Sequence, residues 1–333
     1  MTISLGFLTH LHAGRSAGDA YAIALELFEA AEEIGFDIGW VAQHHFGDDG
    51  GRLASPLTFL AAAAQRTKRI GLGTAVVVLP TEDPVRVAED ALLVDTLSGG
   101  RLQLGIGTGG DPVSFAAFGR DVERRRELFD EAAVVLEDAL AGRPINGTAA
   151  TIGAEGAAIS GRLWQSTLSE GGAARIAARG HGLLVARSAY LSSLPTDIAQ
   201  RPLVERYRAI AGACARVGVS RTVYPARDRR TAAGELRAGV EAYARQMAGQ
   251  GHYPPGLTTD AAFDRAFIHY GHPDQVAASL AADRALPGAT HLICQAAPGQ
   301  PEPARVIRAL ESVARDVLPR LAGARPRPEA ALP

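Results

Sequence analysis

The feature that most constrains this chain is a repeated alternation of short apolar runs with longer amphipathic ones. Such alternation is typical of strand–helix repeats, which build a parallel sheet covered by helices. Eight runs have the character of strands, the seventh most weakly: residues 3–8, 38–42, 70–79, 101–106, 157–165, 182–187, 222–225 and 289–295. Six segments have helical spacing or capping signals: residues 19–34, 55–65, 83–97, 121–140, 171–179 and 302–321.

Eight repeats without a break in composition favour a single (β/α)8 barrel over a doubly wound sheet, which alternates in the same way. We expect residues 1–322 to form an α/β barrel of the TIM type, with excursions after strands 4 and 7. Residues 323–333 are expected to form a flexible tail rich in Pro and Ala. Residues 111–120 and 226–255 are then expected to be the loops that shape a substrate pocket.

The charge balance excludes several classes of partner. Lys and Arg number 34 against 36 for Asp and Glu, so the net charge is −2 and no basic excess is present for nucleic acid or a membrane surface. The first residues lack the basic and apolar segments of a signal peptide, and no apolar run reaches the roughly 18 residues of a membrane span. The sequence therefore predicts a cytoplasmic protein that binds neither nucleic acid nor membrane.

Histidines follow the first two predicted strands, His10 and His12 after the first and His44 and His45 after the second. Active sites of barrels lie at the carboxyl ends of the strands, so these side chains are candidates for chemistry. The adjacent pair could simply be packed, or one imidazole could transfer protons at the barrel mouth. Adjacent strand residues point to opposite faces, which disfavours a metal site, and we predict none. A metal-dependent barrel hydrolase using these four histidines stays open as a further hypothesis.

Glycines follow the fourth predicted strand, where Gly105, Gly107 and Gly110 satisfy the spacing of a dinucleotide-binding fingerprint. We reject that interpretation, because Asp111 and Pro112 follow where the fingerprint requires an opening helix. Glycine would still let a flat ring or a phosphate approach the backbone closely, although an ordinary loop explains the run as well.

A phosphate candidate lies in residues 166–172, between the fifth predicted strand and a helix. Ser169, Gly171 and Gly172 would place a hydroxyl and free N–H groups at a helix N-terminus, which is a ready anion site. Plain N-capping by Ser169 is the alternative explanation.

Several runs together carry a resemblance to a known family. Residues 35–46, GFDIGWVAQHHF, resemble the second strand of bacterial luciferase-like flavin monooxygenases, and residues 72–90 resemble that family's third strand and helix. The resemblance is detailed over roughly residues 1–130 and continues more loosely at 271–276 and in the last strand and helix. Residues 292–301 resemble a subgroup described as FMN-dependent luciferase-like monooxygenases.

The resemblance implies roles for particular residues. His44 matches the histidine that the family uses as a general acid/base beside the flavin. Thr74, Ala75 and Val76 match a segment that lies against the isoalloxazine ring, where the family often has a non-prolyl cis peptide, and we place that bond between Ala75 and Val76. The resemblance also assigns residues to cofactor binding near the rim and the flavin phosphate: Gly107, Thr108, Arg126, Ser169, Gly171 and Gly172.

Three positions depart from the family pattern. Gly107 and Thr108 stand where luciferase has a reactive cysteine and then an arginine. One phosphate contact is therefore missing, so either another group such as Arg126 compensates or binding is weaker. Gln43 stands where a glutamate is common, which removes a charge next to His44. Light emission is therefore not implied.

The function implied by the resemblance is that of a two-component, FMN-dependent monooxygenase. Reduced FMN would come as a co-substrate from a separate NAD(P)H flavin reductase, and O2 would then be used to oxidise a small organic substrate. The family also suggests a homodimer. Two alternatives within the fold are an F420-dependent reductase or dehydrogenase and a non-catalytic flavin-binding subunit.

Overall fold

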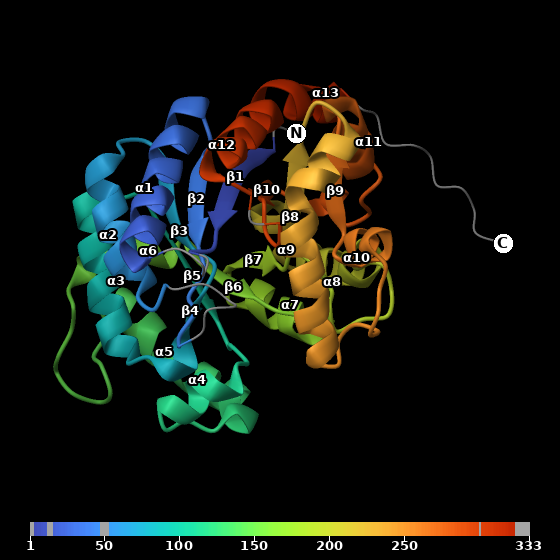
Figure 1. Cartoon of the computed structure of the whole chain (residues 1–333). Helices are drawn as coiled ribbons and strands as arrows, with labels where there is room; N and C mark the ends of the chain where they lie inside the picture. The colour runs from blue at the N-terminus through green and yellow to red at the C-terminus, as the bar shows by residue number, and fades with distance from the viewer. Residues whose placement is uncertain (1–2, 12–15, 47–52, 300, 324–333) are drawn as a thin grey trace.

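The computed structural model describes residues 3–11, 16–46, 53–299 and 301–323. Within these residues, parallel strands close into a barrel of eight positions surrounded by helices, which confirms the predicted fold (Figure 1). The strands occupy these positions in chain order: β1 (Ser4–Thr9), β2 (Ile38–Val41), β3 (Gly71–Thr74), β5 (Leu102–Gly107), β6 (Leu163–Ser166), β7 (Gly182–Val185), β8 (Val217–Pro225) and β10 (His291–Gln295). The barrel closes because β10 pairs with both β1 and β8.

Helices connect the strands and cover the outside of the barrel. They include α1 (Ala17–Ile34), α2 (Pro56–Arg66), α3 (Pro84–Ser98), α5 (Arg125–Leu140), α7 (Glu170–Ala178), α8 (Thr196–Ala211), α11 (Pro273–Ala281), α12 (Pro303–Ser312) and α13 (Leu318–Gly323). Local signals fix several ends: the Asp83 carboxylate accepts two N–H groups at the start of α3, and Gly99 ends that helix with a left-handed φ of 71°.

The third barrel strand is interrupted, whereas the sequence predicted one continuous strand over residues 70–79. β3 ends at Thr74, and the short β4 (Val77–Val78) resumes the pairing with β5. In the gap, the Thr74 hydroxyl donates to the Gly105 carbonyl at 2.7 Å and accepts the Gly105 N–H at 2.8 Å. A Cβ at Gly105 would lie 2.0 Å from the Thr74 carbonyl oxygen, so this position needs glycine.

The second half of the chain departs most from the predictions. The predicted strand 157–165 was wrong at its start, because α6 (Ala157–Ser160) lies there and β6 begins only at Leu163. β8 is nine residues long, where the prediction covered only its last four. Its Arg221 is fully buried, and the Nε of Arg221 pairs with Asp283 at 2.6 Å. A charged residue is costly to bury without a partner, so its presence argues against a buried strand when only the sequence is known.

Two excursions leave the barrel after β5 and β8, as predicted. The first contains α4 (Pro112–Ala117), whose N-terminal N–H groups are capped by Asp111. A helix therefore does open after the glycine run, so the reason given for rejecting a dinucleotide fold was wrong; the barrel topology itself excludes that fold. The second contains α10 (Thr259–Arg265) and β9 (Ile268–Gly271), which pairs with the end of β8.

The second excursion also corrects the predicted loop at 226–255. Most of that segment is the 21-residue helix α9 (Arg229–Gly249), which begins where the Asp228 carboxylate accepts the N–H of Thr231. The helix buries five side chains along one face: Ala232, Leu236, Val240, Ala244 and Met247. Residues 111–120 likewise contain α4. Both segments predicted to shape the pocket are therefore partly helical.

Two tryptophans fill the barrel interior. Trp40 of β2 and Trp164 of β6 meet edge to face with their ring centroids 5.6 Å apart, and both are essentially unexposed. Facing glycines make room for them, because a Cβ on Gly73 or Gly182 would lie 2.2 or 2.3 Å from an indole ring. Trp164 thus fills the core. A ligand must bind at the end of the barrel, since the interior is packed.

Some expectations fall on parts of the chain that the structure does not describe. The predicted tail at 323–333 lies outside the described residues except for Gly323, and His12 lies outside them as well. Across the described ranges, none of the helices combines the length and the apolar character needed to traverse a lipid bilayer.

Candidate active site

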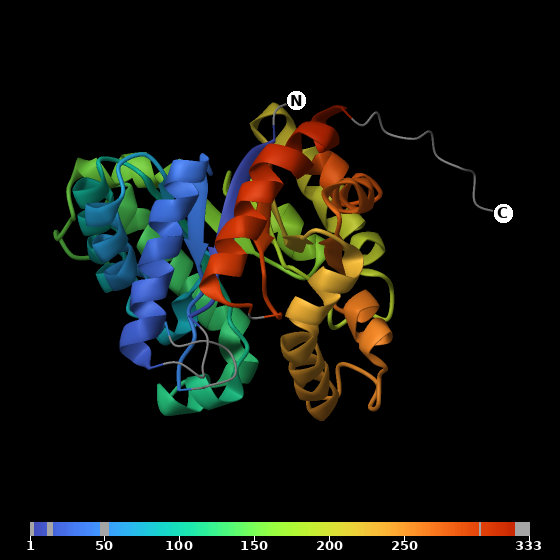
Figure 2. The ribbon, with the colours of Figure 1, turned by 45° about the horizontal axis from the view of Figure 1, so that its top comes forward.

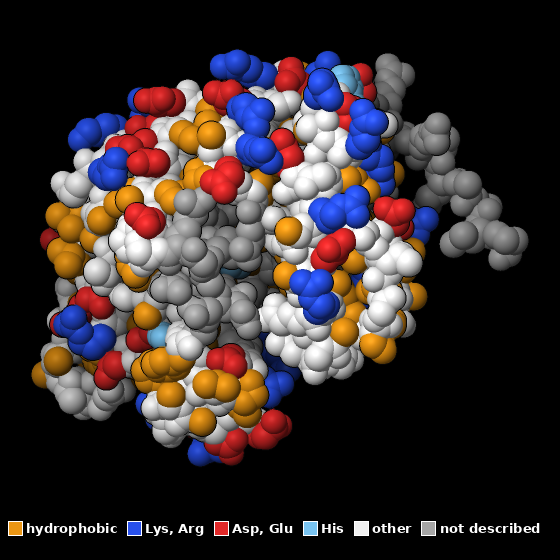
Figure 3. All heavy atoms as spheres, in the orientation of Figure 1, with side chains coloured by type: hydrophobic (Ala, Val, Ile, Leu, Met, Phe, Trp, Pro, Cys, Tyr) orange, Lys and Arg blue, Asp and Glu red, His pale blue; other side chains and the backbone are white. Residues whose placement is uncertain are grey.

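The carboxyl ends of the parallel strands gather at one end of the barrel, here called the mouth. In Figure 1, α4 lies below the strands and α9 to their right, and both helices lie at the lower end of the molecule in Figure 2. Exposed apolar side chains follow the strands there: Phe46, Val113, Phe118, Leu168, Leu191 and Leu194. Figure 3 shows hydrophobic side chains gathered over α4. The mouth therefore offers apolar surface to a ligand.

Ala75 and Val76 lie between β3 and β4, next to the tryptophan-filled interior. The peptide bond between them is cis, as the resemblance predicted. Both residues are half-buried and pack against the cluster that contains Trp40 and Trp164. A Cβ on Gly107 would lie 2.5 Å from Val76 Cγ2, so glycine lets β5 approach this segment closely. Thr74 differs from its neighbours, because it is fully buried and its hydroxyl joins β3 to β5.

His44 lies at the mouth directly after β2, where its backbone N–H donates to the Leu53 carbonyl at 2.9 Å. Burial lowers the pKa of His44, and the adjacent His45 lowers it further, while the carboxylate of Asp111 acts in the opposite direction. The imidazole is therefore neutral near pH 7. A neutral imidazole can accept a proton at one nitrogen while donating from the other.

His44 is hydrogen-bonded to His10, which follows β1. The distance from His10 Nδ1 to His44 Nε2 is 3.3 Å, and His10 Nε2 lies 3.2 Å from Oε1 of Gln295 at the end of β10. The amide of Gln295 in turn donates to Ser220 Oγ of β8 at 2.7 Å. Four polar side chains from four strands thus form one hydrogen-bonded chain across the mouth.

The sequence predicts that Gln43 removes a charge next to His44. Its side chain points away from His44, donates to Glu82 Oε1 at 2.6 Å and accepts the N–H of Val78 at 2.6 Å. Burial raises the pKa of Glu82, and the hydrogen bond from Gln43 opposes that change. The amide therefore fastens β4 to the second strand, and a charge here would face Glu82 instead of His44.

Ser169, Gly171 and Gly172 lie together at the start of α7, directly after β6. Ser169 Oγ accepts the N–H of Gly172 at 3.1 Å, which is the N-cap that the alternative explanation expected. A Cβ on Gly172 would lie 2.0 Å from Thr167 Oγ1, so the turn is tightly packed. The N-cap and an anion site are compatible, because a helix has four N–H groups without intrahelical partners.

Arg126 and Thr108 are not brought together with this turn by any described contact. Arg126 is exposed on α5, in a shallow hollow lined by its neighbours on the same segment: Glu123, Arg124, Glu127, Asp130 and Glu131. Thr108 follows β5, where its hydroxyl lies 3.4 Å from the Gly109 carbonyl. Arg175 is the arginine that approaches the turn, since its Nη1 lies 3.8 Å from the Cβ position of Gly171.

His45 belongs to an aromatic group at the rim. Its ring meets Phe118 edge to face at 4.8 Å, and Phe46 lies 5.6 Å from each of these rings. Burial lowers the pKa of His45, and its Nε2 is buried without a hydrogen-bond partner among the described residues. Phe46 is 67% exposed, so the group presents an apolar surface beside His44.

Sequence reasoning missed Gln295, Ser220, Arg175 and Arg187. Arg187 follows β7, stacks over the Tyr243 ring at 4.7 Å and has a buried Nη1 without a hydrogen-bond partner in the described part of the chain. Position at a strand end is the signal that could have found Gln295 and Arg187. Arg175 could have been found from its helical spacing, four residues after Gly171.

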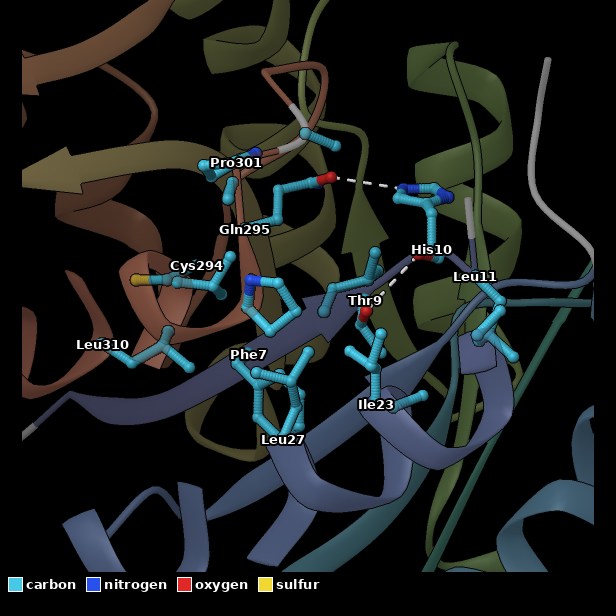
Figure 4. Close-up of a pocket in the computed structure, with 17 residues that line it drawn as sticks. Phe7, Thr9, His10, Leu11, Ile23, Leu27, Cys294, Gln295, Pro301 and Leu310 are labelled. Atoms are coloured by element: carbon cyan, nitrogen blue, oxygen red, sulfur yellow. Dashed lines mark hydrogen bonds between the residues drawn. The ribbon is translucent and has the colours of Figure 1, made fainter. Parts of the chain in front are cut away.

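A side cavity of about 130 Å³ adjoins the chain of hydrogen bonds, between β1, β10, α1 and α12 (Figure 4). Most of its lining is apolar, including Phe7, Leu27 and Leu310. His10 and Gln295 line its polar side and are joined there by their hydrogen bond.

The histidines at the mouth do not form a metal cluster in the described structure. Among residues 3–11, 16–46, 53–299 and 301–323, no three His, Cys, Asp or Glu side chains gather as a metal site would need. His10 and His44 are instead hydrogen-bonded to each other through their ring nitrogens.

Comparison with known proteins places the chain in a family. The profile of the luciferase-like monooxygenases matches residues 1–291, and the chain belongs to this family. It is 40% identical over 142 residues to 4-hydroxyprotoasukamycin monooxygenase from Streptomyces nodosus subsp. asukaensis, covering 42% of this chain and 38% of that protein. It is 42% identical over 106 residues to the alkanal monooxygenase alpha chain of the Kryptophanaron alfredi symbiont, covering 32% and 29%. The aligned segments thus span about two fifths or less of these relatives.

Solved structures match nearly the whole chain. Monooxygenase RslO1 from Streptomyces bottropensis gives a TM-score of 0.73 at 25% identity, over 95% of this chain and 99% of that one. The oxygenating constituent of 3,6-diketocamphane monooxygenase from Pseudomonas putida, solved with FMN, gives 0.76 at 19%, over 96% and 99%. The F420-dependent tetrahydromethanopterin reductase from Methanopyrus kandleri gives 0.72 at 18%, over 96% and 100%. The last two show the shared fold alone.

Proposed function

We propose that the protein is an FMN-dependent monooxygenase that takes reduced flavin from a separate NAD(P)H flavin reductase and oxidises a small organic substrate. The observation that carries this proposal is the mouth itself, where His44 is bonded to His10 and where Gln43, the residue before His44, donates its backbone N–H to the carbonyl of the half-buried Val76 at 3.4 Å. An apolar floor next to a proton-transfer group is what a flat redox ring requires of its protein.

The residues at the mouth fit such a ring. The interior below is filled by Trp40 and Trp164, so a ring would have to bind at the mouth, where Ala75 and Val76 would contact it. Gly107 and Thr108 would border it, since glycine brings β5 close to Val76. When bound, reduced FMN supplies the electrons with which O2 is activated.

The start of α7 would hold the phosphate. Ser169, Gly171 and Gly172 would contribute the hydroxyl and the N–H groups, and the positive end of the nine-residue helix favours an anion. Thr108 removes an arginine that the family uses there. We propose Arg175 for the missing cation, because it already approaches Gly171, whereas Arg126 lies among acidic side chains.

The other residues of the mouth have stated tasks in this proposal. His44 would donate a proton to the bound reactants or accept one from them. Burial lowers the pKa of His44, which favours the neutral imidazole that can act in either direction. His45, Phe46 and Phe118 would cover one side of the ring and exclude water from it. The two excursions at α4 and α9 would then enclose the substrate.

A flavin titration tests the proposal. We expect the protein to quench FMN fluorescence, more strongly under reducing conditions, and to oxidise members of an organic substrate panel only with a flavin reductase, NADH and O2. Binding of F420 in preference to FMN, with hydride transfer under argon, would instead establish the reductase alternative. Two neighbours of this fold act with F420 according to their names. Unchanged turnover in His44→Ala would favour a non-catalytic flavin-binding subunit.

We also propose that the protein forms a homodimer. Leu93 and Leu97 of α3 and Val134 of α5 are 56%, 46% and 49% exposed on two helices that pack against each other. A second copy covering this face would remove apolar surface from water. Light scattering of the purified protein tests it, and Leu93→Arg should convert a dimer of this kind to monomers.

A further inference from the structure

When both imidazoles are neutral, one arrangement of protons satisfies the hydrogen-bonded chain at the mouth. Gln295 donates its amide N–H to Ser220 Oγ, so the amide oxygen of Gln295 faces His10. An amide oxygen only accepts, so the hydrogen in that contact must belong to Nε2 of His10. A neutral imidazole carries one N–H, which leaves Nδ1 of His10 as an acceptor.

The same reasoning continues to His44. The Nδ1 of His10 lies 3.3 Å from the Nε2 of His44, and because Nδ1 accepts, the Nε2 of His44 must donate. Nδ1 of His44 is then the basic nitrogen of the pair. It makes no hydrogen bond to a residue that the structure describes, so it is available to a group bound at the mouth.

We propose that His10 and His44 form a proton-relay pair, held in one tautomeric arrangement by Gln295 and Ser220. A proton that reaches Nδ1 of His44 gives an imidazolium, whose Nε2–H then passes to Nδ1 of His10. His44 is neutral again, and His10 carries the charge while its Nε2–H stays bonded to the amide oxygen of Gln295. Only N–H bonds form and break, and the reverse transfer returns the proton.

The surroundings favour a pair over a single histidine. Burial disfavours a positive charge on His44, and the neighbouring His45 adds to that effect, while Asp111 at the start of α4 partly offsets it. Transfer to His10 moves the charge to the residue that lines the side cavity with Gln295. Gln295 and Ser220 are therefore positioning residues, because they act on His44 only through His10.

The flavin-free protein allows the test. With 15N-labelled histidine, long-range 1H–15N spectra report which nitrogen of each ring carries the proton. We expect His10 and His44 both to carry it on Nε2 at high pH. Gln295→Leu should shift the signals of both rings, although Gln295 contacts only His10. The matched control is Gln165→Leu, which removes a 2.8 Å hydrogen bond to the buried His181 and should shift that ring alone.

A second variant tests whether His10 takes up the proton or only accepts a hydrogen bond from His44. His10→Gln keeps an acceptor for His44 but cannot hold the proton. In the natural sequence the pair should titrate in two steps at least about one pH unit apart, since coupled groups share their protons. In His10→Gln, His44 should titrate in a single step. Thermal unfolding of both variants checks that they fold.

Two results would overturn the proposal: identical titration of His44 with and without His10, or His44 signals that do not respond to Gln295→Leu. The relay depends on the proposed function in one respect only: the flavin reaction is what would supply or consume the proton. A protein that shows the coupling but ignores FMN and F420 would therefore retain the relay and lose the proposed flavin chemistry. A protein that binds FMN with uncoupled histidines would do the opposite.

Discussion

The two ends of the barrel treat their polar groups in opposite ways. At the amino-terminal end, which we call the base, Arg101 donates five hydrogen bonds to the chain between α2 and β3 and to Ser98, at 2.7 to 3.1 Å. Arg162 binds the Asp95 carboxylate through two nitrogens, at 2.7 and 2.9 Å. Glu32 accepts three successive backbone N–H groups. The base therefore satisfies its charges internally.

The mouth leaves polar atoms without partners and apolar rings exposed. Among the described residues, His45 Nε2 and Arg187 Nη1 are buried there and have no hydrogen-bond partner. Phe46 is 67% exposed. Unsatisfied buried groups are rare in native proteins, and they are tolerated where a ligand supplies the partner. We infer from this contrast that residues of the base stabilise the fold, whereas residues of the mouth serve binding and chemistry.

The contrast between the mouth and the base is tested most directly at His44. His44→Gln should lower turnover of the substrate found in the screen by about 10²–10⁴-fold, the usual contribution of general acid–base catalysis. The free energy of unfolding should change by less than about 1 kcal/mol, because the residue is only half-buried. Turnover and urea unfolding of the same preparation measure both effects. A variant with near-normal turnover would remove His44 from the chemistry.

At the base the expected effect is on stability instead. Asp95→Ala leaves Arg162 largely buried without its carboxylate, and we expect a loss of about 3–5 kcal/mol in the free energy of unfolding. FMN affinity of the folded fraction should not change. The control is Asp138→Ala, which breaks a pair exposed by 36% and 58% and should lose less than about 1 kcal/mol. Equal losses in both variants would contradict the special role of the base.

The packed interior separates the two ends of the barrel, and a substitution at Gly73 tests how tightly this interior is packed. Gly73→Ala places a Cβ 2.2 Å from the Trp40 ring, so the variant should lose about 1–3 kcal/mol and show altered tryptophan fluorescence. Gly234 of α9 has open space around it, and Gly234→Ala should gain up to about 1 kcal/mol. Stability gained in both variants would mean that the interior is looser than described.

Gln43 connects the mouth with the sheet around it. Gln43→Glu puts a second carboxylate against Glu82, whose pKa burial already raises, and we expect a loss of about 1–2 kcal/mol at pH 7.5. The loss should shrink toward pH 5.5 as one carboxyl takes up a proton. Urea unfolding at the two pH values measures this, and a loss independent of pH would exclude charge repulsion as its cause.

Buried histidines outside the hydrogen-bonded chain at the mouth make the free energy of unfolding depend on pH. His181, His269 and His291 have their pKa lowered from 6.5 to about 4, chiefly by burial. Between these values the unfolded chain binds more protons, so the free energy of unfolding falls as pH drops from 6.5 toward 4. Each residue contributes up to about 1.4 kcal/mol per pH unit. Replacing His291 with Gln should make the free energy of unfolding depend less on pH, as urea unfolding at several pH values would show. An unchanged pH dependence would mean that His291 does not contribute to it.

The fold was predictable from the sequence where a local signal defined each element. Asp83 and Pro84 mark the start of α3, and Gly99 marks its end. The prediction failed where distant partners decide the structure. β8 looks too polar for a strand until Asp283 pairs with Arg221, and residues 157–160 form a helix although they are apolar enough for a strand.

The candidate site was predictable in part. The strand-end position of His44 and the resemblance at Ala75 and Val76 could be read from the chain, and the cis bond lies where it was expected. Arg175 and Gln295 carried only weak signals, helical spacing for Arg175 and a strand-end position for Gln295, which many other arginines and glutamines share. Which of them approaches the turn at α7 or His10 depends on how the elements pack.

By itself the sequence determined the strand–helix alternation, the helix ends and the presence of histidines at strand ends, because these features arise from residues that are close along the chain. Only the tertiary structure decided which polar groups meet. His10 pairs with His44 across 34 positions and with Gln295 across 285. Such contacts form only when the barrel closes and β10 comes to lie beside β1.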